Sequence, residues 1–116
     1  MLTKRQFINF IRFYQEFSTA VDRFDKAITG KSYSTILFEA DWYNSVGKLL
    51  DIFLESHFNE DGQDLVTWWL FEDVDHTIYH QPDLFSEGKK IEYDVNKLED
   101  LWEYLIMYKE DYFNDE

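Results

Sequence analysis

The chain has 116 residues, of which 45% are hydrophobic and 20% aromatic, and its net charge is −13. This size predicts a single domain over residues 1–116, and so many apolar side chains exclude disorder caused by low hydrophobicity. The lack of cysteine excludes disulfides, thiolate metal sites and cysteine nucleophiles. No apolar run approaches the roughly 20 residues that span a membrane. Polar residues at Asn9 and Arg12 interrupt the one stretch near the N-terminus that resembles a signal peptide. We therefore expect a cytoplasmic protein.

The net charge lies entirely in the second half of the chain. Residues 1–59 hold seven acidic and seven basic residues. Residues 60–116 hold seventeen acidic residues and four lysines, so this half carries the whole charge of −13. A neutral half joined to a strongly anionic half favours a basic partner.

Residues 3–29 carry the pattern of a long amphipathic helix. Aromatic and aliphatic residues recur at the two spacings of a heptad, at Phe7, Phe10, Tyr14, Phe17, Val21, Phe24 and Ile28. Thr3 and Gln6 suit a capping box, and Gly30 suits the position after the last turn. We interpret this segment as the main core helix. Self-association as a coiled coil is the alternative.

Residues 35–58 also show helical spacing. Its predicted buried face holds Trp42, Val46, Leu49 and Phe53, with Leu50 and Leu54 beside them. Gly47 weakens this helix by about 1 kcal/mol relative to alanine, unless a neighbouring helix packs closely there.

A turn is expected at residues 59–62, followed by an apolar segment at residues 65–71. We favour a helix capped by Asp61 or Asp64, because acids near its start suit the positive end of the helix dipole. Adjacent residues on a helix point about 100° apart. One of Trp68 and Trp69 is therefore expected in the core and the other partly exposed, where it is available to a partner.

Residues 76–94 favour β-structure. Thr77–Tyr79 and Lys90–Tyr93 are β-type segments separated by Pro82 and a turn at residues 86–88, which predicts a small two-stranded hairpin with a long loop. Asp94 is expected to cap a last helix from about Val95 to Tyr112. The predicted fold is mainly α (α+β), with three to four helices, the long N-terminal helix and the hairpin.

The predicted last helix separates its apolar side from an acidic side. Glu99, Asp100, Glu103, Glu110 and Asp111 fall together on the acidic side. We expect the strip to continue through other acids of this half, namely Glu72, Asp73, Asp75, Asp83, Glu87, Glu92 and Asp94. Residues four apart on a helix have Cβ atoms about 5 to 6 Å apart, so Glu99 and Glu103 form a row of like charge. Such a row suits the basic residues that proteins aim at nucleic-acid phosphates. The strip predicts a protein that imitates nucleic acid; an ordinary solvated face is the alternative.

Other chemistries find less support. His76 and His80 would share one face of a helix and bind a metal with Asp73, but the residues between them favour a strand, and no HExxH motif is present. GxSxG and phosphate-binding glycine loops are also missing from the sequence, so we expect neither an enzyme nor a bound cofactor. The charge of −13 disfavours direct binding of nucleic acid.

The stretches Glu72-Asp73-Val74-Asp75 and Glu99-Asp100-Leu101-Trp102-Glu103 carry a class-level resemblance. With them, this short, cysteine-free, acidic and aromatic-rich chain resembles the small inhibitors of phages and mobile elements, including anti-CRISPR and anti-restriction proteins. It is also similar to acidic immunity proteins that neutralise nuclease toxins. The resemblance implies a non-enzymatic protein that blocks the basic groove of a nucleic-acid-processing enzyme. An immunity or antitoxin protein is the first alternative, and an assembly protein that oligomerises through its N-terminal helix is the second.

Overall fold

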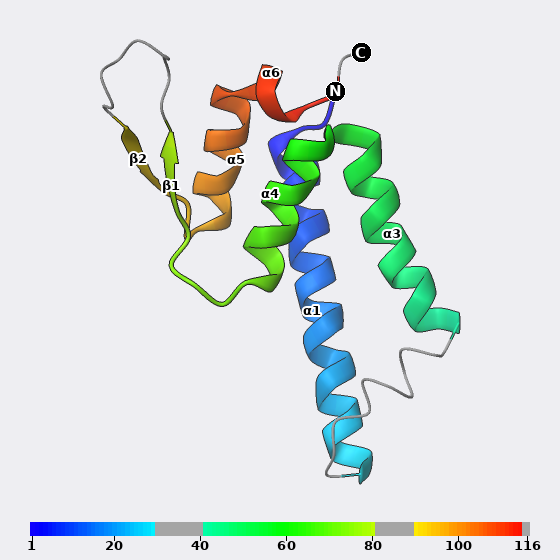
Figure 1. Ribbon diagram of the computed structural model, residues 1–116. Helices are drawn as coiled ribbons and strands as arrows, with labels where there is room; N and C mark the ends of the chain where they lie inside the picture. Colours follow the sequence, from blue (N-terminus) through cyan, green and yellow to red (C-terminus); the bar gives the residue numbers. More distant parts are fainter. Residues whose placement is uncertain (30–40, 81–89, 115–116) are drawn as a thin grey trace. The chain divides into compact units, whose positions relative to one another are not determined.

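The computed structural model describes residues 1–29, 41–80 and 90–114, although most side chains between residues 21 and 46 lie outside the description. Its elements are α1 (Lys4–Thr29), α3 (Asp41–His57), α4 (Glu60–Phe71), β1 (Thr77–His80), β2 (Ile91–Asp94), α5 (Leu98–Met107) and α6 (Lys109–Tyr112) (Figure 1). The mainly helical fold with a long N-terminal helix and a small antiparallel strand pair confirms the predicted fold class. Five helices are described where three to four were expected.

The chain divides into two compact units, Met1–Phe58 and Asn59–Glu116. This boundary coincides with the change in charge, because the first unit holds equal numbers of acids and bases and the second carries the net charge of −13. The single domain expected from chain length stays a prediction. None of the described helices is long and apolar enough to cross a membrane.

The start of α1 has the predicted capping box. The Thr3 hydroxyl accepts a hydrogen bond from the Gln6 N–H at 3.2 Å, and the Gln6 side chain accepts one from the Thr3 N–H at 2.9 Å. These bonds satisfy two donors that the first turn of a helix leaves unpaired. They fix where α1 begins.

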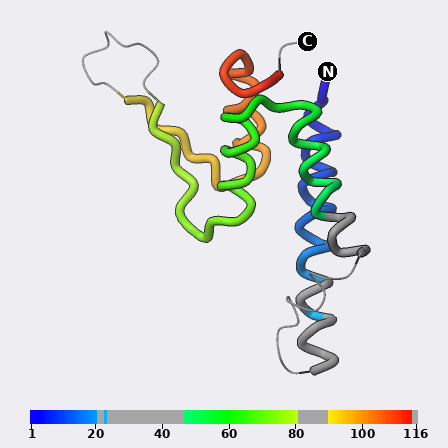
Figure 2. Tube along the Cα trace, turned by 45° about the vertical axis from the view of Figure 1, so that its right-hand side comes forward, coloured from blue at the N-terminus to red at the C-terminus, as the bar shows by residue number. Residues whose placement is uncertain are grey.

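The first turns of α1 run beside the end of α3 (Figure 2), and aromatic contacts hold them together. Phe10 stacks on Phe53 with ring centroids 3.9 Å apart, and Phe7 meets Phe58 edge to face at 6.0 Å. This part of the heptad stripe therefore packs within the first unit, as a core helix would. The structure does not describe the rest of the predicted stripe, which comprises the side chains of Val21, Phe24 and Ile28, or the predicted C-terminal residue Gly30.

The buried face of α3 differs from the predicted one. Leu50 and Leu54 are buried, whereas Leu49 is 48% exposed and Phe53 is half-buried. Residues one position apart point about 100° apart on a helix, so the covered side is turned toward Leu50. The apolar surface of this helix is wider than one stripe, and its sequence period cannot tell which flank will be covered.

Helix α4 begins at a different cap from the predicted one. Asn59, not Asp61 or Asp64, is the N-cap, and its side-chain oxygen accepts a hydrogen bond from the Gly62 N–H at 2.9 Å. The predicted division of the tryptophan pair is confirmed, since Trp69 is buried and Trp68 half-buried. The Trp69 indole donates to the Val95 carbonyl at 2.6 Å.

Strands β1 and β2 pair antiparallel with Ile78 opposite Tyr93. The predicted strand segments are thereby confirmed to within one residue at each end. Asp94 ends β2 and does not cap a helix, which is a correction: α5 begins at Leu98, and its N-cap Lys97 makes no side-chain capping bond. The carboxylate of Asp94 is engaged instead by Asn96.

The predicted single helix from Val95 to Tyr112 is wrong. Helix α5 ends at Met107, Tyr108 adopts a non-helical backbone with φ −116° and ψ 41°, and the short α6 follows. The Tyr108 side chain stacks on His80 at 3.9 Å and bonds to Tyr93. Contacts with the strand pair thus hold the residue at which the helix breaks.

We predict that Gly47→Ala stabilises the protein by about 1 kcal/mol, because alanine is the better helix former. A Cβ atom added at Gly47 meets no atom within 4 Å, so nothing in the described structure opposes the substitution. Urea unfolding measures the change. The neighbouring exposed Lys48→Ala is the control and should shift stability by less than about 0.5 kcal/mol. Destabilisation by Gly47→Ala would contradict the prediction.

Candidate partner-binding surface

The predicted acidic residues that the structure describes are almost all exposed. Exposed side chains are those of Glu72, Asp73, Asp75, Glu92, Asp94, Asp100, Glu103, Glu110 and Asp111. Glu99 is half-buried, and the predicted Asp83 and Glu87 lie outside the described residues. The break at Tyr108 places Glu110 and Asp111 on α6, so they do not extend the acidic side of α5. The acids therefore form several groups rather than one helical row.

One of these groups joins segments that are far apart in sequence. Asn59 donates hydrogen bonds from its main-chain N–H to the Tyr112 carbonyl at 2.9 Å and from its side chain to the Asp111 carbonyl at 2.8 Å. These bonds hold the first turn of α4, with Glu60 and Asp61, beside α6. We call Glu60, Asp61, Glu110 and Asp111 the α4–α6 acidic cluster.

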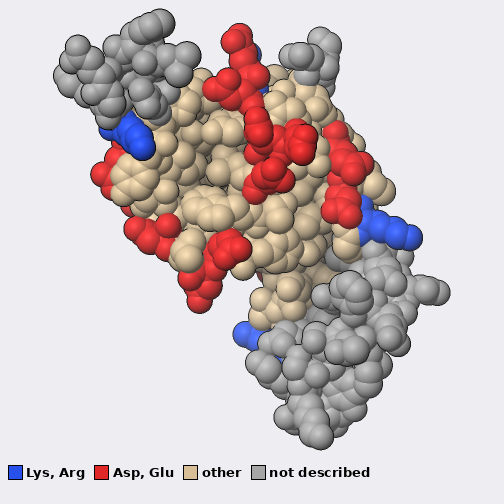
Figure 3. All heavy atoms as spheres, viewed as in Figure 1, with Lys and Arg blue, Asp and Glu red and all other residues tan. Residues whose placement is uncertain are grey.

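All four side chains of this cluster are exposed. Figure 3 shows acidic side chains gathered over α6 and the start of α4. Glu60 and Asp61 lie in the first turn of the 12-residue α4, where the positive end of the helix dipole stabilises carboxylates. The dipole of α4 thereby offsets part of the repulsion among the four like charges.

Sequence reasoning missed Glu60 and Asp61 as site residues. It assigned them to a turn and expected the helix cap at Asp61 or Asp64, two or five residues after the observed cap Asn59. The available signal was Asn59, a strong N-cap residue followed by two acids. Nothing local in the sequence places that helix start beside α6.

A second group of acids lies at the base of the strand pair. The Asn96 side-chain amide donates to Asp75 at 2.8 Å and to Asp94 at 2.7 Å, and its oxygen accepts from the His76 N–H at 2.9 Å. Hydrogen bonds to Asp94, first from the Asn96 N–H and then from its side chain, lower the pKa of that carboxyl group, with a smaller contribution from Lys97. One amide thus holds two carboxylates in fixed positions.

Tyrosines attach the strand pair to α5 and α6. Tyr93 and Tyr108 share a hydroxyl hydrogen bond of 2.6 Å, and Tyr104 and Tyr112 share one of 2.8 Å. The Nδ1 atom of His80 lies 3.3 Å from the hydroxyl oxygen of Tyr104. We call these five residues the tyrosine cluster.

Two members of the tyrosine cluster, Tyr104 and Tyr108, ionise less readily than a free tyrosine. The hydrogen bond to Tyr93, followed by burial, raises the pKa of Tyr108 to about 12. Burial, followed by the hydrogen bond to Tyr112, raises the pKa of Tyr104 well above its ordinary value. Tyr104 and Tyr108 are therefore uncharged at neutral pH, and the acids around them supply the negative charge.

The two histidines do not meet. His76 lies against the rings of Trp68 at 4.7 Å and Trp69 at 5.6 Å, whereas His80 stacks on Tyr108. Within the described residues, no group of three or more histidine and acidic side chains is arranged to hold a metal ion. The hypothesis of a metal site with His76, His80 and Asp73 gains no support from this geometry.

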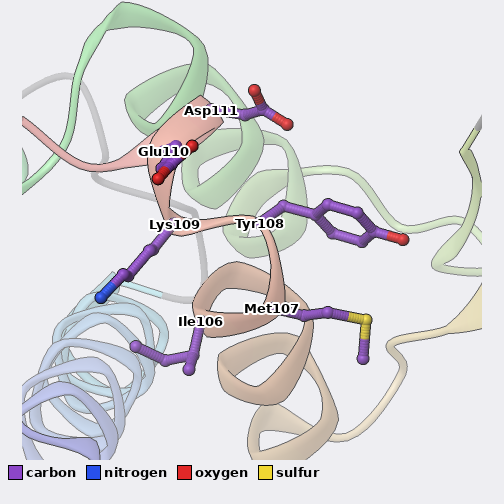
Figure 4. A pocket seen from close by; sticks show the side chains of 6 residues that line it. All are labelled: Ile106, Met107, Tyr108, Lys109, Glu110 and Asp111. Carbon is purple, nitrogen blue, oxygen red and sulfur yellow. The ribbon is translucent and has the colours of Figure 1, made fainter. Parts of the chain in front are cut away.

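A cavity of 230 Å³ lies at the break between α5 and α6 and is lined by the six consecutive residues Ile106–Asp111. In Figure 4 their side chains diverge, with Met107 and Tyr108 pointing to one side and Ile106 and Lys109 to the other. An active site requires groups that converge on a reacting atom. This cavity offers no such arrangement.

The chain matches no protein-family model, no curated protein and no solved structure. Its function must therefore be argued from the surface described above.

We predict that Asn96→Ala raises the pKa of Asp94 toward its ordinary value, because the two largest stabilising contacts of the carboxylate are altered or lost. Carbon-detected NMR titration of the carboxyl groups measures this. The hydrogen-bonded carboxylate stabilises the wild-type protein above the unfolded-state pKa, and this contribution disappears as the pH falls through the lower folded-state pKa. The variant should lose less stability over that acidic range. Lys97→Met is the control and should raise the pKa less.

We predict that Tyr93→Phe lowers the pKa of Tyr108, because it removes the hydrogen bond that contributes most to the value of about 12. Ultraviolet titration of the phenolate band measures it. In the wild-type protein the unfolded state ionises first, so stability falls as the pH rises between about 10 and 12. An exposed tyrosine, Tyr79→Phe, is the control. An unchanged titration of Tyr108 in Tyr93→Phe would show that the hydroxyl contact is absent in solution.

Proposed function

We propose that this chain is a non-enzymatic binding protein that inhibits a nucleic-acid-processing enzyme, such as a nuclease or a CRISPR effector, by occupying its basic groove. The observation that carries the proposal is the separation of charge between the two units. The second unit holds the entire charge of −13, and all of its described acids except Glu99 are exposed. Hydrogen bonds position the segments that carry several of them.

The positions of the acids support imitation of nucleic-acid phosphates more strongly than the number of acids does. In the α4–α6 acidic cluster, hydrogen bonds from Asn59 hold two acid pairs on different helices close together. At the base of the strand pair, Asn96 holds Asp75 and Asp94. Charges fixed before binding lose little conformational freedom when a partner engages them, so they favour affinity for a rigid row of Lys and Arg. An immunity protein for a basic nuclease toxin would use the same surface.

We predict that neutralising the α4–α6 acidic cluster weakens inhibition. The variant Glu60→Gln, Asp61→Asn, Glu110→Gln, Asp111→Asn should bind a susceptible nuclease about 10- to 100-fold less tightly. The nuclease is first captured from lysate at low salt and then assayed for DNA cleavage with added inhibitor. Binding of the wild-type chain should also weaken steeply with salt and compete with DNA.

The matched control removes acidic charges from the first unit instead. Glu16→Gln with Asp51→Asn removes two exposed acids and should leave inhibition within about twofold of wild type, since these positions lie outside the anionic unit. Inhibition that is unaffected by the cluster substitutions, or equally weakened by the control, would refute the mimicry proposal.

The assembly alternative makes a different prediction. Phe10 is half-buried and stacks on Phe53 within the first unit, so Phe10→Glu should destabilise the fold by about 2 kcal/mol whatever the oligomeric state. Phe13 on the same helix is 53% exposed and should accept glutamate with a change below about 1 kcal/mol. Analytical ultracentrifugation of Phe13→Glu distinguishes the two cases. An oligomer that dissociates on this substitution would favour assembly, and an unchanged monomer favours the inhibitor.

A further inference from the structure

We propose that the outer edge of β2 accepts an extended basic segment of the protein partner, which adds to the sheet as a third strand. The inference rests on the proposed function and assigns one element of the partner's recognition. It concerns the strand pair and does not involve the α4–α6 acidic cluster.

The register shows which main-chain groups point outward. The Val95 N–H donates to the His76 carbonyl at 2.9 Å, and residues 76 and 95 are direct neighbours in the continued register. In an antiparallel pair, hydrogen-bonded and non-hydrogen-bonded positions alternate. Tyr93 therefore faces β1 through its main chain, whereas the N–H and C=O groups of Glu92 and Asp94 point to the outer edge.

This edge is open in the described structure. Glu92 and Asp94 are exposed, and no described residue hydrogen-bonds to their main-chain N–H groups. Within residues 1–29, 41–80 and 90–114 the sheet has two strands, so β2 has one edge paired with β1 and one edge that no described strand pairs. An unpaired strand edge is a template for an added strand.

Charge selects the occupant of the edge. The side chains of Glu92 and Asp94 lie two residues apart and so point to the same face of the sheet. A strand with Lys or Arg at alternate positions would place its basic side chains opposite them, which stabilises a sheet, whereas like charges in these positions destabilise it. A second copy of β2 would bring the same acids together. The edge therefore disfavours self-pairing and favours a basic strand.

The other face of the strand pair is anchored. Tyr93 and His80 contact Tyr104 and Tyr108, so the pair is held on α5 and its break. A two-stranded sheet is only marginally stable alone. Here the tyrosine cluster holds the strands in place before a third strand arrives, which lowers the entropy cost of docking.

The test uses the full chain and a short synthetic peptide in which lysine alternates with threonine. Hydrogen exchange followed by NMR should slow at the amides of Glu92 and Asp94 when the peptide binds, while the Tyr93 amide, already paired, serves as the internal reference. Two further peptides carry N-methyl groups on every lysine nitrogen or on every threonine nitrogen. Because alternate N–H groups point to opposite edges, one of these peptides should bind about tenfold more weakly and the other should retain affinity.

A matched pair of protein variants separates the contribution of the main-chain N–H of Glu92 to peptide binding from the contribution of its carboxylate. Glu92→Gln keeps the outward N–H and loses the carboxylate, whereas Glu92→Pro loses both without removing a bond to β1. The Pro variant should bind the peptide about tenfold more weakly than the Gln variant. Equal binding of all three peptides, or unchanged exchange at Glu92 and Asp94, would overturn the proposal even if Glu92→Pro fails to fold. If the cluster variant of the previous section still weakens nuclease inhibition in that case, the proposed function stands without the strand edge.

Discussion

The second unit depends on the main chain of Val95, the residue that joins β2 to the segment leading into α5. Val95 is 1% exposed, so neither its N–H nor its C=O can be left without a partner at low cost. The N–H donates to the carbonyl of His76, the residue before β1, and the C=O accepts from the Trp69 indole in α4. The main chain of one buried residue therefore ties the strand pair to α4. It also brings Asn96, the next residue, to the position in which its amide reaches both Asp75 and Asp94.

Local sequence predicted those features that local interactions determine. The capping box of Thr3 and Gln6 needs only residues three apart, and the strands follow from short β-type segments between turn residues. The division of Trp68 and Trp69 follows from helix geometry alone. In each case, the physical cause lies within a few residues of the feature, so a single sequence contains it.

Long-range contacts determine the features that the sequence did not reveal. Tyr108 breaks the last helix without glycine or proline nearby, and its ring and hydroxyl are held by His80 and Tyr93 from the strand pair. Asn59 becomes a cap and also binds α6, a segment more than fifty residues later. Composition located the net charge correctly in the second half. The grouping of Glu60 and Asp61 with Glu110 and Asp111 required the fold.

The coincidence of the charge boundary with the boundary between units has a kinetic consequence. Beyond a Debye length, about 8 Å at physiological ionic strength, the first unit contributes no net attraction or repulsion, because its acids and bases are equal in number. The encounter rate with a positively charged surface is therefore set mainly by the net charge of residues 59–116. Substitutions in the first unit that conserve its neutrality can alter packing or stability while leaving the rate of association nearly untouched, whereas each acid lost from the second unit slows the encounter with such a surface.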